Sequence, residues 1–162
     1  MTSTAARLAL VALLLAATAG CVNNIEGAVG VTRAPNGHLA LAVVWCDRPS
    51  TMGAWILKQN PWKAVVEYKN PEVDSVSDFQ ILDIDSPEAP WQLSSGLAKL
   101  YPDVDYTAEA WPGDGKNGIF GQVGFRLKDV EKLKTGQVWL GTPGHVVTWN
   151  YFLEYAEKDA CS

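Results

Sequence analysis

The chain lacks any hydrophobic run long enough to cross a membrane. Its longest apolar segment, Leu8–Ala17, has ten residues, whereas a transmembrane helix needs about 20. As a helix, ten residues span only about 15 Å, which is half of the hydrocarbon core of a bilayer. We therefore expect no transmembrane helix at this segment, and no later segment comes closer to the required length.

Clusters of basic residues are also lacking. The chain has 13 Lys and Arg against 18 Asp and Glu, which gives a net charge of −5. Proteins that bind nucleic acid gather Lys and Arg against the phosphates. The composition therefore predicts that nucleic acid is not a partner.

Recognisable catalytic motifs are absent. The sequence has no G-x-S-x-G motif, and its two histidines, His38 and His145, each lie beside turn residues, where a solvated histidine is the usual interpretation. In the segment 113–118 (GDGKNG), Asn117 follows Lys116, whereas a phosphate-binding P-loop needs Ser or Thr there and a helix afterwards. The sequence predicts no catalytic residues and no cofactor.

Two pairs of closely spaced acidic residues are the only pattern in the sequence that suggests a metal ion. They are Asp83 with Asp85, and Asp103 with Asp105. A calcium loop of the EF-hand type needs Gly at its sixth position, and loops that begin at Asp83 and Asp103 have Glu88 and Ala108 there. We therefore interpret both pairs as solvated loop acids and predict no metal site.

The amino-terminal segment has the parts of a secretory signal peptide. Arg7 precedes the apolar run Leu8–Ala17, and the small residues 18–20 (TAG) follow it. Cys21 comes directly after them, and this arrangement resembles a bacterial lipobox. The resemblance implies cleavage before Cys21 and lipidation of its thiol. A plain cleaved signal peptide and an uncleaved anchor are the alternatives.

The lipobox resemblance also implies a place and a partner. Residues 1–20 would be the signal peptide, residues 21–24 a short tether, and residues 25–162 a single domain of ordinary size. The lipid on Cys21 would hold the protein at the outer face of the cell membrane. Any further partner, an envelope protein or a glycan, stays unidentified at this stage.

Two cysteines remain once Cys21 is assigned to the lipid. Cys46 and Cys161 would then lie in an oxidising compartment, where disulfides form and persist. We predict that they pair, and two free buried thiols are the alternative.

Alternating apolar residues predict an all-β fold. About eight segments have strand character, and no long segment has the 3.6-residue period of a helix. We expect a single antiparallel β-sandwich, with a small closed β-barrel as the alternative. The region 86–101 is expected to be mainly irregular. The expected strands are Ile25–Val31, His38–Cys46, Ala54–Lys58, Trp62–Tyr68, Tyr106–Trp111, Ile119–Leu127, Gly136–Leu140 and Val146–Glu154.

The segment 125–140 resembles the connection before the penultimate strand of immunoglobulin-like sandwiches. Apolar Phe125, Leu127, Val130 and Leu133 are followed by a Gly that leads into a strand. The resemblance implies an immunoglobulin-like sandwich and places the tyrosine-corner position at Val138.

Seven tryptophans stand out in a chain of this length. Trp62, Trp91 and Trp111 each adjoin a proline, and a loop tryptophan held in this way can stack on a sugar or fill a partner's pocket. It can equally close the end of the sandwich, which is the commoner role for a large aromatic side chain. Trp91 and Trp111 are the candidate ligand-binding residues.

Together these features predict a non-catalytic lipoprotein of the cell envelope that binds a partner or has a structural role. The chain resembles small lipoproteins of high-GC Gram-positive bacteria, a resemblance that implies no particular activity. A carbohydrate- or peptide-binding module that uses the loop tryptophans is the first alternative. An enzyme is the second.

Overall fold

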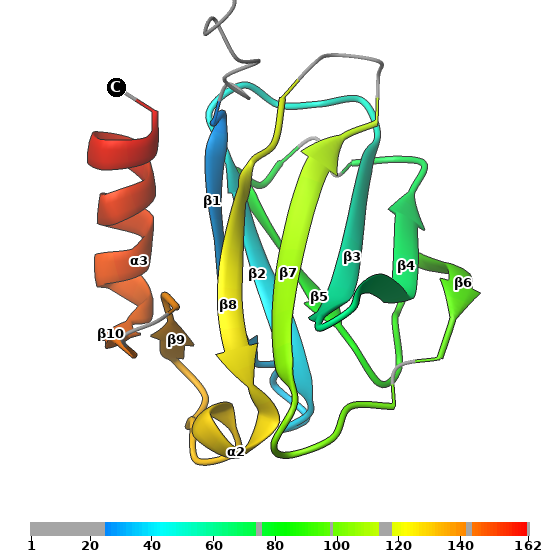
Figure 1. Ribbon diagram of the computed structural model, residues 1–162. Coiled ribbons are helices and arrows are strands. Elements are labelled where there is room, and N and C mark those ends of the chain that lie inside the picture. Colours follow the sequence, from blue (N-terminus) through cyan, green and yellow to red (C-terminus); the bar gives the residue numbers. More distant parts are fainter. Residues whose placement is uncertain (1–24, 74–75, 98, 114–117, 142–143, 162) are drawn as a thin grey trace, which may run out of the picture.

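Two antiparallel five-stranded sheets pack face to face in the computed structural model (Figure 1). The structure describes residues 25–73, 76–97, 99–113, 118–141 and 144–161. In spatial order, the first sheet consists of β10 (Val146–Thr148), β9 (Gln137–Trp139), β1 (Gly27–Arg33), β2 (Leu39–Trp45) and β5 (Phe79–Asp83). The second consists of β6 (Gln92–Gly96), β4 (Trp62–Asn70), β3 (Met52–Gln59), β7 (Asp105–Pro112) and β8 (Gly121–Arg126).

The fold class predicted from the sequence is therefore confirmed. Each sheet keeps two separate edge strands within the described residues, so the alternative of a closed barrel is wrong. The first two expected strands are present as β1 and β2, which form a hairpin that pairs from Gly27 opposite Trp45 to Arg33 opposite Leu39.

The main core lies between the sheets and draws side chains from both inner faces. Its largest fully buried members include Tyr68, Tyr106, Phe120, Leu41 and Met52. A second, smaller core lies on the outer face of the first sheet. There Ala28, Ala42 and Val44 pack against a carboxyl-terminal helical segment, which explains why β2 is apolar on both faces.

That helical segment overturns one predicted strand. Val146–Glu154 was expected to be extended, but only β10 is a strand, and α3 (Trp149–Tyr155) follows and continues as η1 (Ala156–Ala160). Thr148 caps the helix, because its Oγ1 accepts a hydrogen bond from the backbone N–H of Tyr151 (3.3 Å). The apolar residues that pack on the first sheet have helical spacing: Trp149, Phe152, Leu153, Ala156 and Ala160.

The region 86–101 is less irregular than expected, because it contains the edge strand β6. β6 pairs with β4 and is exposed along its whole length. It lacks the apolar alternation that identifies a strand in a sequence.

The strand orders of the two sheets are β6-β4-β3-β7-β8 and β10-β9-β1-β2-β5, and every pair of neighbouring strands is antiparallel. Near the start of β7, the hydroxyl of Tyr106 accepts a hydrogen bond from the backbone N–H of Tyr101 (2.9 Å). Val138, which the resemblance places at the tyrosine-corner position, lies in β9, after the short helix α2 (Leu127–Val130).

The predicted disulfide between Cys46 and Cys161 is present. Their Cα atoms lie 5.2 Å apart, although 115 positions separate the residues in sequence. Cys46 directly follows β2 and its backbone N–H bonds to the carbonyl of Glu26 (2.8 Å). The disulfide therefore lies at the end of the sandwich where the described chain begins, and it fixes the end of the helical segment there.

Candidate functional site

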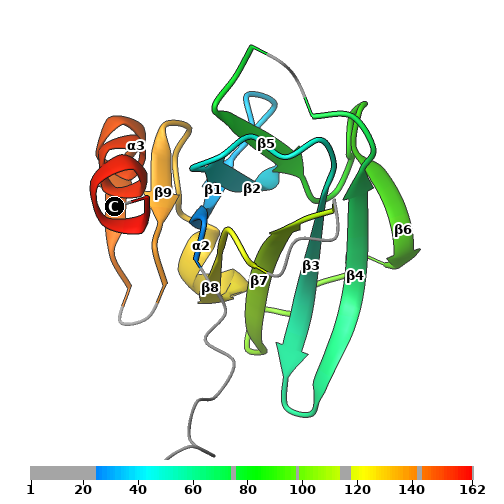
Figure 2. The same cartoon turned by 90° about the horizontal axis from the view of Figure 1, so that it is seen from above.

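The outer faces of the two sheets differ in what covers them. The helix α3 packs on the first sheet, and in the view from above it lies beside β9, far from β3 and β7 (Figure 2). No helix of the described residues packs on the outer face of the second sheet. That face is therefore the larger surface that the fold leaves open.

Side chains on the open face alternate with core side chains along β3 and β7. Met52, Ala54 and Ile56 of β3 point into the core, as do Tyr106, Ala108 and Ala110 of β7. The residues between them point outward. We call this outward set the tryptophan face, and it consists of Gly53, Trp55, Leu57, Thr107, Glu109 and Trp111.

Two tryptophans meet at the centre of this face. The rings of Trp55 and Trp111 lie 4.4 Å apart between centroids and are tilted by 48°. Gly53 lies directly opposite Trp111, and a Cβ atom at Gly53 would overlap the Trp111 ring. The glycine therefore lets the indole lie flat across the neighbouring strand, so that both partly exposed rings form one aromatic surface.

Glu109 places a carboxylate next to the aromatic pair. It lies opposite Trp55 in the register of β3 and β7 and is half-buried. Burial is the main cause that raises the pKa of Glu109 above its ordinary value. The face thus combines rigid aromatic area with a strong hydrogen-bond acceptor that water solvates poorly.

The lower end of the face is polar and continues into a hollow. Gln59 donates a hydrogen bond from Nε2 to Thr107 Oγ1 (2.9 Å) and lines a hollow of about 610 Å³ together with Asp105, Arg126 and Trp139. Arg126 is held in place by Asp129 at 2.9 Å. An extended ligand on the aromatic pair could therefore reach polar groups further along the strands.

The structure separates the two tryptophans that the sequence singled out. Trp111 is part of the tryptophan face, but Trp91 is 5% exposed and belongs to the main core, where it closes the sandwich. Trp55, which the sequence analysis did not select, is the ring that accompanies Trp111. Cys21, the predicted lipidation site, lies outside the described residues.

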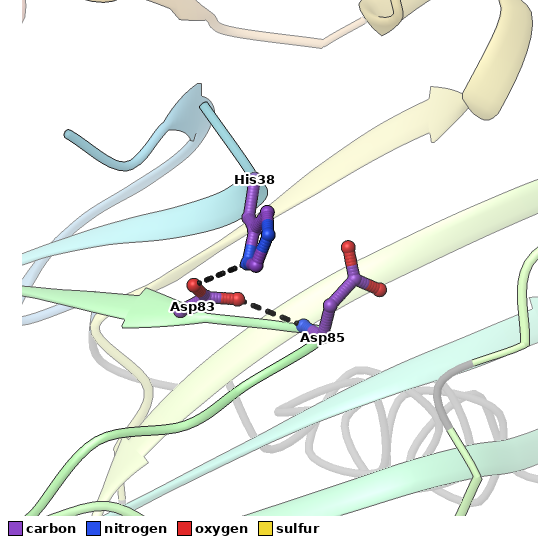
Figure 3. A group of neighbouring side chains, drawn as sticks. All are labelled: His38, Asp83 and Asp85. Carbon is purple, nitrogen blue, oxygen red and sulfur yellow. Dashed lines mark hydrogen bonds and ion pairs between the residues drawn. The ribbon is translucent and has the colours of Figure 1, made fainter. Parts of the chain in front are cut away.

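A group of titratable side chains lies at the end of the sandwich opposite the disulfide. It consists of His38, Asp83 and Asp85 (Figure 3). Asp83 ends β5, and His38 precedes β2, which pairs with β5. The imidazole Nδ1 of His38 lies 2.9 Å from Asp83 Oδ2.

Asp83 is not the solvated loop acid that the sequence predicted. It is 6% exposed, and its carboxylate accepts hydrogen bonds from Asn36 Nδ2 (2.8 Å) and from the backbone N–H groups of Asp85 and Ser86 (both 2.9 Å). Burial works against the charged form, but the bonds from Asn36, Ser86, His38 and Asp85 outweigh it and lower the pKa of Asp83. The residue is therefore a buried anion that ties the β1–β2 turn to the end of β5.

Asp85 and His38 are more accessible than Asp83. Asp85 is exposed, and the side chain of His38 is 44% exposed. Below them the Tyr68 hydroxyl donates a hydrogen bond to the carbonyl of Ile84 (2.7 Å). Burial, together with Asp85 and Asp83, raises the pKa of Tyr68, which stays a neutral donor and fixes the chain between the two acids.

Comparisons with family models, with curated proteins and with solved structures give no match to this chain. Within the described residues, no helix is both long enough and apolar enough to span a membrane.

Proposed function

We propose that the protein is a non-catalytic glycan-binding protein of the cell envelope, held by lipid on Cys21, and that the tryptophan face is its ligand-binding surface. One observation carries the proposal. The Trp55–Trp111 pair lies beside Glu109 on a sheet face that no described helix covers, whereas the other sheet is covered by α3.

A glycan fits the chemistry of this surface better than other ligands. A sugar ring offers an apolar C–H face that packs on an indole, while its hydroxyls donate hydrogen bonds to a carboxylate such as Glu109. Rigid aromatic rings also lose little conformational entropy on binding. An acidic chain without basic clusters is poorly suited to polyanions such as nucleic acid.

The covalent chemistry of the chain favours a place outside the cytoplasm. Disulfides such as Cys46–Cys161 persist in oxidising compartments. From Cys21 to Ile25 the chain can reach at most about 14 Å. A lipid on Cys21 would therefore hold the disulfide end of the sandwich close to the membrane surface, with the strands of the tryptophan face leading away from it.

The ligand assignment can be tested by titration. Purified protein is titrated with a panel of oligosaccharides that includes soluble peptidoglycan fragments, and binding is followed by calorimetry and tryptophan fluorescence. Trp111→Ala and Glu109→Gln should keep the β-sheet circular dichroism but weaken binding at least tenfold. Tyr151→Ala, which removes an exposed aromatic from α3, is the matched control and should bind normally.

Two results would overturn the glycan assignment. One is that no oligosaccharide of the panel binds. The other is that a bound oligosaccharide retains its affinity in both Trp111→Ala and Glu109→Gln, which would place its site elsewhere.

The anchoring requires a separate test in cells. Cys21→Ala should release the protein from the membrane fraction or leave its precursor unprocessed, because stable anchoring depends on the acyl chains. Wild-type protein that is wholly soluble and carries no added mass at Cys21 would contradict the lipid anchor without bearing on the tryptophan face.

A further inference from the structure

We propose that His38, Asp83 and Asp85 form a binding site for a divalent transition metal ion such as Zn²⁺. One nitrogen or oxygen atom from each of the three residues lies within 4.8 Å of those of the other two. Figure 3 shows the imidazole and both carboxylates gathered at the end of β5. This site is distinct from the tryptophan face and does not depend on its function.

The donor set selects the class of ion. One imidazole nitrogen with two carboxylate oxygens suits Zn²⁺ and its neighbours among the transition metals, whereas Ca²⁺ prefers six to eight oxygen ligands. The site should therefore discriminate between the two ions.

Charge at this end of the sandwich favours a cation. Asp83 is a buried carboxylate, Asp85 is an exposed one, and Glu88 lines the same hollow as Asp83. Among the hydrogen bonds and ion pairs described for Asp83, none comes from Lys or Arg, and His38 is its single ion-pair partner. A metal ion would replace the proton between His38 Nδ1 and Asp83 Oδ2 and supply the missing positive charge.

The backbone prepares the site in advance. Asn36 and two backbone N–H groups fix the Asp83 carboxylate, and the backbone N–H of His38 bonds to Asn36 Oδ1 (2.9 Å). Two of the three ligands are therefore already positioned. Only the exposed Asp85 side chain must turn toward the ion.

Calorimetric titration of the purified protein with ZnCl₂ and, separately, CaCl₂ tests the site. We expect one Zn²⁺ per chain and at least tenfold weaker binding of Ca²⁺. His38→Gln and Asp85→Asn should each weaken Zn²⁺ binding at least tenfold. His145→Gln, which changes the only other histidine, should bind as the wild type does.

Asp85→Asn keeps the test decisive if His38→Gln disturbs the turn, because the Asp85 side chain is exposed and circular dichroism can confirm the fold. Absence of stoichiometric Zn²⁺ binding would overturn the proposal. So would Zn²⁺ binding that Asp85→Asn leaves unchanged, or that His145→Gln weakens as much as His38→Gln does.

Discussion

Two residues of the tryptophan face carry a cost to the stability of the fold. Glu109 keeps a carboxylate half-buried on the sheet face, where burial raises its pKa. Gly53, the second residue of β3, gives up a side chain within a strand, where glycine is unfavourable. The missing side chain leaves room for the Trp111 ring.

Replacing Glu109 should therefore stabilise the protein at neutral pH. Because the folded-state pKa of Glu109 is raised above its ordinary value of 4.5, the neutral acid is favoured by folding. Its contribution is complete below that value and is lost as pH rises through the raised pKa. Glu109→Gln should therefore be more stable than the wild type at pH 7, and it should lose less stability as the pH rises above 4.5.

Urea denaturation at several pH values measures this effect. Glu67→Gln, a change on the neighbouring strand β4 at a carboxylate opposite Trp55, is the control. If Glu109→Gln is less stable than wild type at pH 7, the interpretation of Glu109 as a destabilising, functional group is wrong.

Gly53→Ala should disturb the aromatic pair, because the added methyl group would overlap the Trp111 ring. Overpacking of this kind costs about 1–3 kcal/mol, and tryptophan fluorescence should change with the displaced indole. In a Trp111→Ala background the ring is absent, so Gly53→Ala should become neutral or stabilising. Equal costs in both backgrounds would show that Trp111 is not the residue that requires the glycine.

Among the elements, α3 is one that the sequence pattern did not reveal. The segment Val146–Glu154 begins with valines and aromatic residues, which favour strands. Its first three residues, Val146–Thr148, do form the strand β10. Tertiary packing favours the helix over a strand here, because Phe152 packs on a sheet face made of small residues such as Ala28 and Ala42. Gly30 contributes to this surface, since a Cβ there would meet both Val138 and Phe152.

Truncation of the buried helix side chain tests this account. Phe152 is fully buried, and Phe152→Ala should cost about 3–5 kcal/mol while it loosens α3 from the sheet. Tyr151→Ala, on the exposed side of the same helix, should cost little. Hydrogen exchange should show faster exchange in 149–160 for Phe152→Ala, and unchanged exchange there would mean that the helix does not depend on this contact.

At the scale of the whole molecule, the sequence pattern predicted the two-sheet sandwich but not the tryptophan face. The alternation in β1 and β8, together with the continuous apolar run of β2, was sufficient to predict a sandwich, because these patterns follow from sheet packing alone. The tryptophan face depends on the register between β3 and β7, which brings Gly53 opposite Trp111 and Trp55 opposite Glu109. Strands so far apart in sequence reveal no such register before they pair.

The disulfide should contribute strongly to global stability. In the chain-entropy model, a loop that spans 115 positions is worth about 4–5 kcal/mol, although measured values often fall short. Cys46→Ser and Cys161→Ser should lower the melting temperature by similar amounts, and the double variant should lose little more. Alkylation of the unfolded, unreduced protein should label neither cysteine. Labelling of both would contradict the pairing in the purified protein.

The same disulfide makes residues 46–161 a covalent ring from which the β1–β2 hairpin extends. A protease that cuts any one loop of this ring, such as the turn between β3 and β4, leaves two fragments that the disulfide still joins. The amino-terminal segment and the tryptophan face would thus remain parts of one molecule after a single cut. A cut just before Cys46 would instead leave the hairpin held only by non-covalent contacts, which are strand pairing and core packing.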